Sequence, residues 1–372
     1  MNRPEIRRAV LCVAWALIAA GIHLVQPIAS TALPRPPAAS TEYLVNDSHF
    51  HLTNYIQEGT DIRDFLKIMG TKVGRATLFG LPLQQEWSYE NSGDFAPTYY
   101  LQTDAPLYYY SFTDACIAMA YRSLTKEQQA RFDPMITGFN PADMYAVDHI
   151  RRVLETFPGV FSGIGEFTVH KEFVSAKIAG GPPSLQNPAL DRILDFAAEA
   201  GLVVLIHSDV DVPFARSGSE PTYLAQTMAL LKRHPGATII WAHLGLGRVV
   251  RPVKDQAAIA EGILRDPAFS HVNFDISWDE VAKYLGTAPD STPPIVDIMN
   301  RYPTRFLFGT DEVAPSSQEK YLRIYELYRP LWHLLDKETS ERVRKENYER
   351  IFDEGRRRVR AWEQTHIKQP RD

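Results

Sequence analysis

The sequence predicts an α/β fold, a (β/α)8 TIM barrel, extended by a long tyrosine-rich insertion and by a helical segment near the C-terminus. Short, almost continuously apolar segments alternate with amphipathic ones along the chain, a pattern typical of a parallel sheet covered by helices. Eight such apolar segments within about 270 residues suit this barrel, which usually takes about 250. The alternative, a doubly wound open sheet, is disfavoured because no glycine-rich phosphate loop follows the first expected strand.

The expected strands are apolar runs bounded by turn residues. They occupy residues 43–51, 74–82, 133–139, 161–167, 201–209, 237–245, 271–278 and 304–312. Apolar residues at three- and four-residue spacing predict helices over residues 144–158, 187–201, 222–236 and 256–268. The insertion, residues 84–131, belongs in a loop of the barrel, where it could close over the active site or pack against a partner subunit. The segment from Gln318 to Thr365 predicts a long charged helix outside the barrel.

The bulk composition is that of a globular protein and excludes some classes of function. The 372 residues are 45% hydrophobic and 23% charged, which is enough to bury a large core. A formal net charge of −5 gives no basic surplus for a phosphate backbone, so nucleic-acid binding is not expected. Cys12 and Cys116 are the only cysteines, which excludes a thiolate metal site and, once Cys12 is removed with the leader, a disulfide.

The first 32 residues have the order of a secretory signal peptide. Arginines at positions 3, 7 and 8 precede an apolar run from Ala9 to Val25, and small residues follow up to Ala32. We therefore expect a signal peptide over 1–32, a linker over 33–45 and a barrel domain over 46–372, with the mature protein periplasmic or secreted and free of the membrane. An uncleaved anchor is the alternative, because the apolar run nearly reaches the roughly 17–25 residues that span a bilayer.

Polar residues stand where the expected strands end. In this barrel the reacting groups come from the C-terminal ends of the strands, which open on one face. The residues at those ends are His49 and His51 for the first strand, Glu166 for the fourth, His207 for the fifth, His243 for the sixth and Asp311 for the eighth. The two-residue period of a strand places His49 and His51 on the same side, while Asp47 shares that side but lies deeper, as a structural acid would.

Each of these residues has an ordinary structural explanation when it is taken alone. Asp311 could cap a helix, and His207 and His243 could be buried, hydrogen-bonded imidazoles. Together they favour a site, because six such groups converging on one mouth would be costly to bury unpaired. Neutral imidazole and carboxylate form the ligand set that suits zinc, manganese or iron.

Five motifs in order carry a resemblance to a known family. They are "SHFH" at 48–51, "GIGEF" at 163–167, "LIHSD" at 205–209, "WAHLG" at 241–245 and "FLFGTD" at 306–311. With them the chain resembles the amidohydrolase superfamily, in particular its amidohydrolase-related, metal-dependent hydrolase branch, which includes aminocarboxymuconate-semialdehyde decarboxylase. The resemblance extends from residue 46 to about 355, where "KENYERIFD" is similar to the short helix that closes these domains.

The resemblance implies a ligand set. Its metal ligands match His49, His51, His207 and Asp311. His243 matches a histidine that is a second-metal ligand in binuclear members and a catalytic or polarising group in mononuclear ones, and Glu166 takes the place of a bridging carboxylate. The branch generally uses one ion. We expect one divalent ion, zinc by preference with manganese or iron as alternatives, and regard a second ion, held through Glu166 and His243, as the less favoured arrangement.

The expected activity is that of an exported metal-dependent hydrolase, in which an activated water attacks an ester, lactone or amide-like carbon of a small molecule. Asp311 would exchange protons with that water, and His243 would polarise the substrate. Non-oxidative decarboxylation of a small unsaturated carboxylic acid is the alternative reaction, and a non-catalytic metal-containing binding protein is the alternative class. The expected substrate-binding residues are His170, Lys171, Arg248 and Trp278. The expected partner is a small molecule, and a homodimer is left open.

Overall fold

The structure is a computed structural model, and it describes residues 43–53, 59–81, 110–171, 184–216, 219–247, 256–286, 288 and 290–367. The predicted signal peptide, most of the predicted linker, the insertion before residue 110 and Arg248 lie outside the described residues. Among the helices that the structure does describe, none combines the length and the apolar character needed to cross a membrane.

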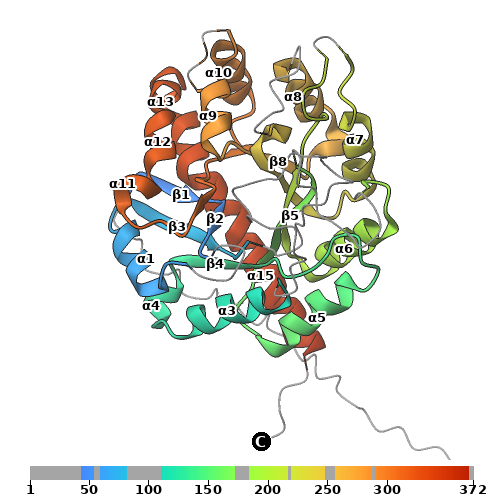
Figure 1. The fold of residues 1–372 in the computed structure, drawn as a ribbon, viewed down its shortest axis with the longest axis vertical. Helices are drawn as coiled ribbons and strands as arrows, with labels where there is room; N and C mark the ends of the chain where they lie inside the picture. The colour runs from blue at the N-terminus through green and yellow to red at the C-terminus, as the bar shows by residue number, and fades with distance from the viewer. Residues whose placement is uncertain are drawn as a thin grey trace, which may run out of the picture. The chain divides into compact units, whose positions relative to one another are not determined.

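Eight parallel strands form the main sheet, in the order β1-β3-β4-β5-β6-β7-β8-β9. Neighbours in the sheet are therefore neighbours in the chain, as in a barrel (Figure 1). Each of the eight predicted strand segments overlaps one of these strands, although β3 and β4 begin one residue earlier than predicted and β5 ends three residues later. Their bounds are β1 Val45–Asp47, β3 Val73–Leu78, β4 Phe132–Ile136, β5 Gly163–His170, β6 Val203–Ser208, β7 Thr238–Trp241, β8 Val272–Asp275 and β9 Phe306–Leu307.

The ring closes between the first and the last strand. Two short strands, β2 (Phe50–His51) and β10 (Glu312–Val313), continue β1 and β9 and pair in parallel with each other. An isolated bridge between His51 and Phe79 ties β2 to the end of β3. The Asp311 amide also donates to the His49 carbonyl over 2.7 Å. These contacts complete the predicted (β/α)8 TIM barrel.

Helices cover the outside of the strands (Figure 1). Those between the strands are α1 Ile62–Met69, α3 Tyr110–Arg122, α4 Lys126–Gln129, α5 Ala146–Thr156, α6 Pro188–Ala200, α7 Leu224–Arg233, α8 Gln256–Arg265, α9 Asp279–Leu285 and α10 Thr292–Arg301, with 3-10 turns η1 Ala242–Gly245 and η2 Pro267–Phe269. Helices α5 to α8 lie inside the four predicted helical segments. Local chemistry explains the bounds of α6, since the Asn187 side chain accepts from the Ala189 amide and Gly201 ends the helix in the left-handed conformation at φ 76°.

The C-terminal segment is not one long helix. It is divided into α11 Gln318–Tyr321, α12 Arg323–Leu327, α13 Arg329–Leu334, α14 Lys337–Glu341, the π-helical turn η3 Arg342–Glu346 and α15 Asn347–His366. Pro330 lies in the first turn of α13, where its missing amide hydrogen is tolerated, and Leu335 is extended at ψ 147°. These two features interrupt a segment whose charge pattern alone predicts continuous helix.

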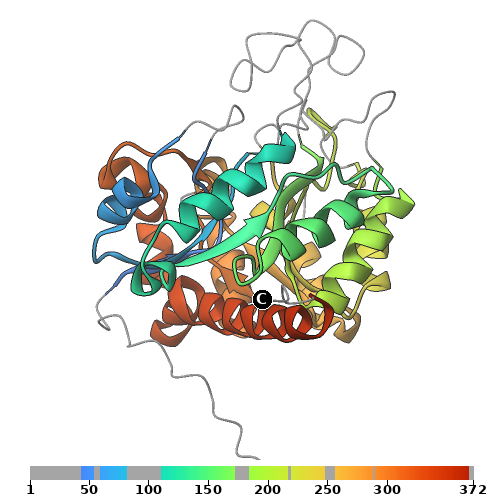
Figure 2. The ribbon, with the colours of Figure 1, turned by 90° about the horizontal axis from the view of Figure 1, so that it is seen from below.

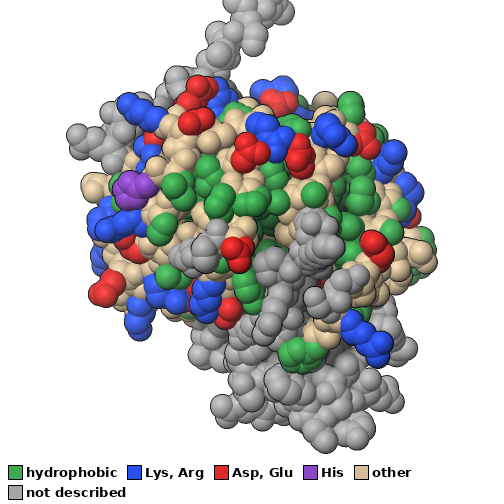
Figure 3. Space-filling model, turned by 90° about the horizontal axis from the view of Figure 1, so that it is seen from above, with side chains coloured by type: hydrophobic (Ala, Val, Ile, Leu, Met, Phe, Trp, Pro, Cys, Tyr) green, Lys and Arg blue, Asp and Glu red, His purple; other side chains and the backbone are tan. Residues whose placement is uncertain are grey.

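Helix α15 runs beneath the strands, along the lower edge of the view in Figure 2. Its Tyr348, Ile351 and Phe352 belong to a buried cluster with residues of the barrel strands, among them Val203 and Leu307. The barrel interior is therefore packed with side chains at this end, as in other barrels of this type. On the face drawn in Figure 3, basic and acidic side chains of the described residues are interspersed among apolar ones.

A buried ion-pair network joins α15 to the strands. Asp133 is fully buried, and its carboxylate lies 2.7 Å from Arg75 Nη2 and 2.6 Å from Arg356 Nη2. The Tyr348 hydroxyl donates to the same carboxylate over 2.7 Å. Burial would raise the pKa of the Asp133 carboxyl, but the charges of the two guanidinium groups and the bond from Tyr348 hold it below its ordinary value.

We predict that Asp133→Asn lowers the free energy of unfolding by about 3–5 kcal/mol at pH 7, because it leaves two guanidinium groups without their buried counter-charge. Urea denaturation followed by circular dichroism measures the difference. Because the folded-state pKa is depressed, the stabilisation by Asp133 is complete at neutral pH and is lost as the pH falls from about 4 through the folded-state pKa.

Asp353→Asn is the matched control, because Asp353 binds the same Arg75 (2.6 Å) with a side chain that is 62% exposed. Its effect should stay below about 1 kcal/mol, since water screens an exposed pair. Equal stability of the Asp133 and Asp353 variants would contradict the role given to the network.

Candidate metal centre

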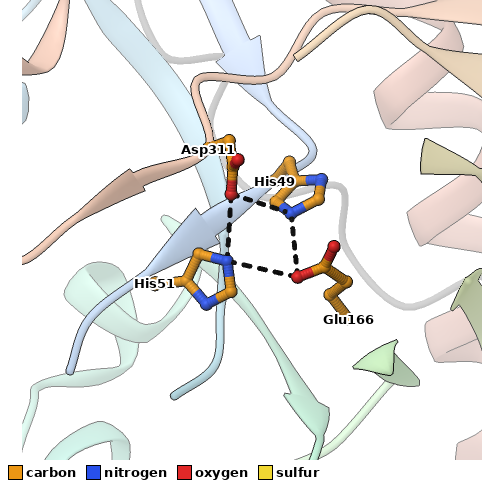
Figure 4. Close-up of side chains that lie close together, drawn as sticks. All are labelled: His49, His51, Glu166 and Asp311. Carbon is orange, nitrogen blue, oxygen red and sulfur yellow. Dashed lines mark hydrogen bonds and ion pairs between the residues drawn. The ribbon is translucent and has the colours of Figure 1, made fainter. Parts of the chain in front are cut away.

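Four predicted side chains meet at the C-terminal ends of the strands. His49 lies between β1 and β2, His51 in β2, Glu166 in β5 and Asp311 directly before β10, and their polar atoms point toward one another (Figure 4). His49 Nε2 and His51 Nε2 lie 3.2 Å and 3.1 Å from Asp311 Oδ1. The same two nitrogens lie 3.7 Å and 3.6 Å from Glu166 Oε2. The structure thus brings together residues that are far apart in the chain.

On β5, the fourth strand of the barrel, the Glu166 carboxylate can point inward because Gly165 precedes it in the chain. Gly165 has φ 116°, a conformation that side chains rarely adopt, and a Cβ there would lie 2.1 Å from the Leu205 carbonyl oxygen on β6. The close approach of β5 and β6 therefore depends on glycine at this position. It places Glu166, which is 1% exposed, inside the ring of histidines.

Asp47 anchors the loop that carries His49. Its Oδ1 accepts from the amides of His49 (3.0 Å) and Thr310 (2.9 Å), and its Oδ2 accepts from the hydroxyls of Thr310 (2.6 Å) and Tyr321 (2.8 Å). Burial raises the pKa of Asp47 to about 6 against the effect of these bonds. Asp47 is therefore a structural acid that joins the first strand to the last, as the sequence predicted, and it directs none of its oxygens to the cluster.

Hydrogen bonds fix the tautomers of the two cluster histidines. His49 Nδ1 lies 2.9 Å from Asp275 Oδ2, and His51 Nδ1 lies 3.2 Å from the Gly80 carbonyl oxygen. A carbonyl or an ionised carboxylate only accepts, so in the neutral form of each ring Nδ1 carries the hydrogen and Nε2 carries the lone pair that a metal ion would use. His49 Nε2 is buried without a hydrogen-bond partner among the described residues. Metal-binding histidines are typically held by their other nitrogen in this way.

The donor set fits a divalent metal ion. Ligand atoms about 2.0–2.1 Å from a tetrahedral ion lie roughly 3.3 Å apart, and the four N–O separations between His49, His51, Glu166 and Asp311 run from 3.1 to 3.7 Å. Imidazole and carboxylate are ligands that zinc, manganese and iron accept. An ion between these atoms would also satisfy the unpartnered His49 Nε2.

Buried carboxylates give this site an excess of negative charge. Burial would raise the pKa of Asp311, but the charge of His49 holds it well below its ordinary value. Burial would likewise raise the pKa of Glu166, which Lys171 and His49 hold well below its ordinary value. The pKa of His49, which burial would lower, is raised well above its ordinary value by Asp311 and Asp275. The carboxylates are therefore ionised and attract a positive charge to His49 Nε2.

A second group of donors lies on the other side of Glu166. His207 Nδ1 is 2.6 Å and His243 Nε2 is 3.6 Å from Glu166 Oε1. Glu166, His207 and His243 could hold an ion of their own. His207, predicted as a ligand of the same ion as His49 and His51, belongs to this group instead of the four-donor cluster.

Two carboxylates and a serine that the sequence did not single out position these histidines. Asp275 accepts from the His243 amide (2.9 Å) as well as from His49, and Ser277 Oγ lies 2.9 Å from His243 Nδ1. Asp209 Oδ1 lies 3.0 Å from His207 Nε2. Asp275 and Asp209 each stand at the end of a barrel strand, so the rule that identified the other site residues also points to them.

Of the predicted substrate-binding residues, Lys171 and Trp278 lie beside Glu166 and His243, whereas Arg248 falls outside the described residues. Trp278 is 8% exposed, with its ring 5.2 Å from that of His243, and Lys171 Nζ lies 5.6 Å from the Trp278 ring centroid. His170 stacks on Tyr223, with ring centroids 3.7 Å apart, and burial lowers its pKa to about 4. The register of β5 shifts between Thr168 and His170, so strand alternation does not carry the direction of Glu166 to His170.

One family model matches most of the chain. The sequence model of a family described as amidohydrolase matches residues 47–353. A search of curated proteins found no match.

Solved structures resemble the chain in fold. An amidohydrolase from Burkholderia multivorans is 14% identical, with 83% of this chain and 99% of that chain covered and a TM-score of 0.50. A protein from Acinetobacter baumannii described as a probable 2-pyrone-4,6-dicarboxylic acid hydrolase is 12% identical, with coverages of 83% and 99% and a TM-score of 0.48. A 5-carboxyvanillate decarboxylase from Sphingomonas paucimobilis is 13% identical, with coverages of 78% and 82% and a TM-score of 0.44. At these identities the likeness concerns the fold alone.

We predict that Asp275→Asn weakens the binding of a divalent ion by about 10- to 100-fold, because His49 loses the carboxylate that orients its ring. Isothermal titration with Zn²⁺ measures the affinity, and circular dichroism checks the fold. Asp297→Asn is the control, since that side chain is 67% exposed on α10. Equal affinity of the Asp275 variant and the unaltered protein would show that Asp275 does not support the ligand.

Proposed function

This chain belongs to the amidohydrolase family, and on that premise we propose that it is a metal-dependent hydrolase acting on an ester, lactone or amide-like carbon of a small molecule. One observation carries the proposal. The Nε2 atoms of His49 and His51 face carboxylate oxygens of Glu166 and Asp311 in a buried cluster. That arrangement suits a divalent cation and would be costly without one.

His49, His51, Glu166 and Asp311 would hold the ion, with zinc as the first choice and manganese or iron as alternatives. A divalent ion bound there supplies Lewis acidity and lowers the pKa of a bound water toward neutrality. The role of the protein is to hold the ligands, to exclude bulk water and to move protons between named atoms.

Asp311 is the proposed proton carrier. Its Oδ1 faces His49 and His51, while its Oδ2 lies 3.9 Å from His243 Nε2. One oxygen can therefore serve the ion while the other accepts a proton from the attacking water and later returns it to the leaving group.

His243 acts best as a proton acceptor in this arrangement. Its Nδ1 faces the Ser277 carbonyl oxygen (3.3 Å) and the Ser277 hydroxyl, and that hydroxyl in turn donates to Asp275 Oδ1. The hydrogen is thus on Nδ1, and Nε2 carries a lone pair, which is buried without a partner among the described residues. Burial lowers the pKa of His243. The expected role of polarising the substrate would need a hydrogen on Nε2, so proton transfer with Asp311 is the role that we propose.

Non-oxidative decarboxylation stays as the alternative reaction, because a buried ammonium group, that of Lys171, lies at the mouth and could attract a substrate carboxylate. We propose further that residues 1–32 direct export and are removed, leaving a periplasmic or secreted protein. Mass spectrometry of the mature N-terminus tests that part separately.

We predict that His49→Ala and Asp311→Ala each lower kcat by at least about 10²- to 10⁴-fold, since one removes a ligand and the other a ligand and proton carrier. Metal analysis of protein purified without chelators should find a transition metal in the unaltered protein and less in both variants. Turnover of a lactone, amide and ester panel measures activity, and circular dichroism should be unchanged. Asp297→Ala, on the exposed face of α10, is the control. Full activity in both site variants would refute the proposal.

We predict that turnover in ¹⁸O-labelled water places one labelled oxygen in the product without release of carbon dioxide. This result follows from attack of water on the substrate carbon. Mass spectrometry of the product and of the headspace gas measures both quantities. Carbon dioxide release without uptake of label would replace hydrolysis by decarboxylation.

A further inference from the structure

A lysine ammonium group lies beside the second group of donors. Lys171 directly follows β5 and is 6% exposed. Its Nζ lies 3.8 Å from Glu166 Oε1 and 5.6 Å from the centroid of the Trp278 ring, which itself contacts the ring of His243. A buried cation is thus placed next to the oxygen that a second metal ion would need.

The two oxygens of Glu166 have different surroundings. Oε2 faces His49 and His51 at 3.7 Å and 3.6 Å, separations compatible with an intervening ion. Oε1 is only 2.6 Å from His207 Nδ1, which is a hydrogen-bond length. Two ligand atoms of one tetrahedral ion lie roughly 3.3 Å apart, so His207 and Glu166 would have to move slightly apart to share an ion. All three donors of the second group are nevertheless present, so a missing ligand would not be what keeps this group free of an ion.

We propose that the Lys171 ammonium takes the place of a second metal ion beside Glu166, so that the enzyme works with one divalent ion. The positive charge of Lys171 explains why a second metal ion would be excluded. A divalent ion shared by Glu166, His207 and His243 would lie next to a buried like charge, where the low dielectric makes repulsion strong. The Lys171 ammonium group supplies positive charge beside Glu166 Oε1, as the first ion would beside Oε2.

The inference rests on the proposed function, because it presupposes an ion held by His49, His51, Glu166 and Asp311. It adds that the ion count is set by Lys171 and not by a missing ligand. Removing the charge should therefore admit a second ion to residues that are already present. This consequence can be measured without any substrate.

Equilibrium dialysis against Mn²⁺ tests the proposal, with bound metal measured by elemental analysis and electron paramagnetic resonance used to distinguish isolated from exchange-coupled ions. The purified protein should bind one ion per chain. Lys171→Met should bind a second ion at least tenfold more tightly than the unaltered protein and should show the coupled spectrum. Lys171→Gln provides the same test if the methionine variant does not fold. Lys171→Arg keeps the charge and should bind one ion.

Two controls locate the effect. Lys67→Met removes a lysine whose side chain is 77% exposed and should leave the count at one. The double variant Lys171→Met/His243→Ala should lose the second ion again. A second ion bound equally well by the unaltered protein and by Lys171→Met, or bound by neither, would overturn the inference while leaving the proposed function intact. A protein that binds no ion at all would overturn both.

Discussion

The pairing of the first strand with the last is the constraint on which both the barrel and its site depend. His51 and Asp311 are 260 residues apart in the chain, yet their side chains lie 3.1 Å apart. Asp47 makes this possible by accepting from the backbone or hydroxyl groups of His49, Thr310 and Tyr321. Each of these bonds satisfies a buried polar group and also fixes the distance between the two strands. The contacts that close the barrel are therefore also the contacts that bring the candidate metal-binding residues together.

The buried histidines of the site are each held through one ring nitrogen. His49, His51 and His243 each have an Nδ1 held by a carboxylate, a carbonyl or a serine hydroxyl. This leaves three Nε2 atoms directed at the carboxylates of Glu166 and Asp311. A site of this kind needs little rearrangement when it receives a cation, which is how preorganised sites lower the cost of binding. The supporting residues matter as much as the ligands for that reason.

Much of the fold and of the site could be predicted from the sequence, and the reasons differ for each part. Apolar runs and helical spacing identified the strands and helices α5 to α8, since burial on one or both faces leaves a periodic pattern. Strand ends identified the residues that could hold a metal ion, because parallel strands open on one face. The division of these residues into two groups of donors could not be predicted. His207 and His49 belong to different groups because they lie next to different oxygens of Glu166.

Other features depend on three-dimensional contacts that leave no local pattern. The hydrogen on His243 Nδ1 follows from Ser277, which reaches it from the neighbouring strand end. The register of β5 shifts between Thr168 and His170, so strand alternation does not predict on which side of the sheet Lys171 lies. In the C-terminal segment, charge spacing favours helix throughout, whereas Leu322, Pro330 and the extended Leu335 lie at breaks between its helices. Sequence patterns reflect the average environment of a residue, whereas these features depend on contacts between individual atoms.

Helix α15 has a consequence for the order in which the chain becomes stable. Its Tyr348, Ile351 and Phe352 fill the lower end of the barrel, and its Arg356 neutralises Asp133 from below. During synthesis these residues leave the ribosome after all eight strands have been made. A nascent chain with a complete sheet therefore still has an open apolar base and an under-compensated buried carboxylate. The barrel can be completed only after translation has passed this helix, so final packing is expected to be a late step rather than a strand-by-strand one.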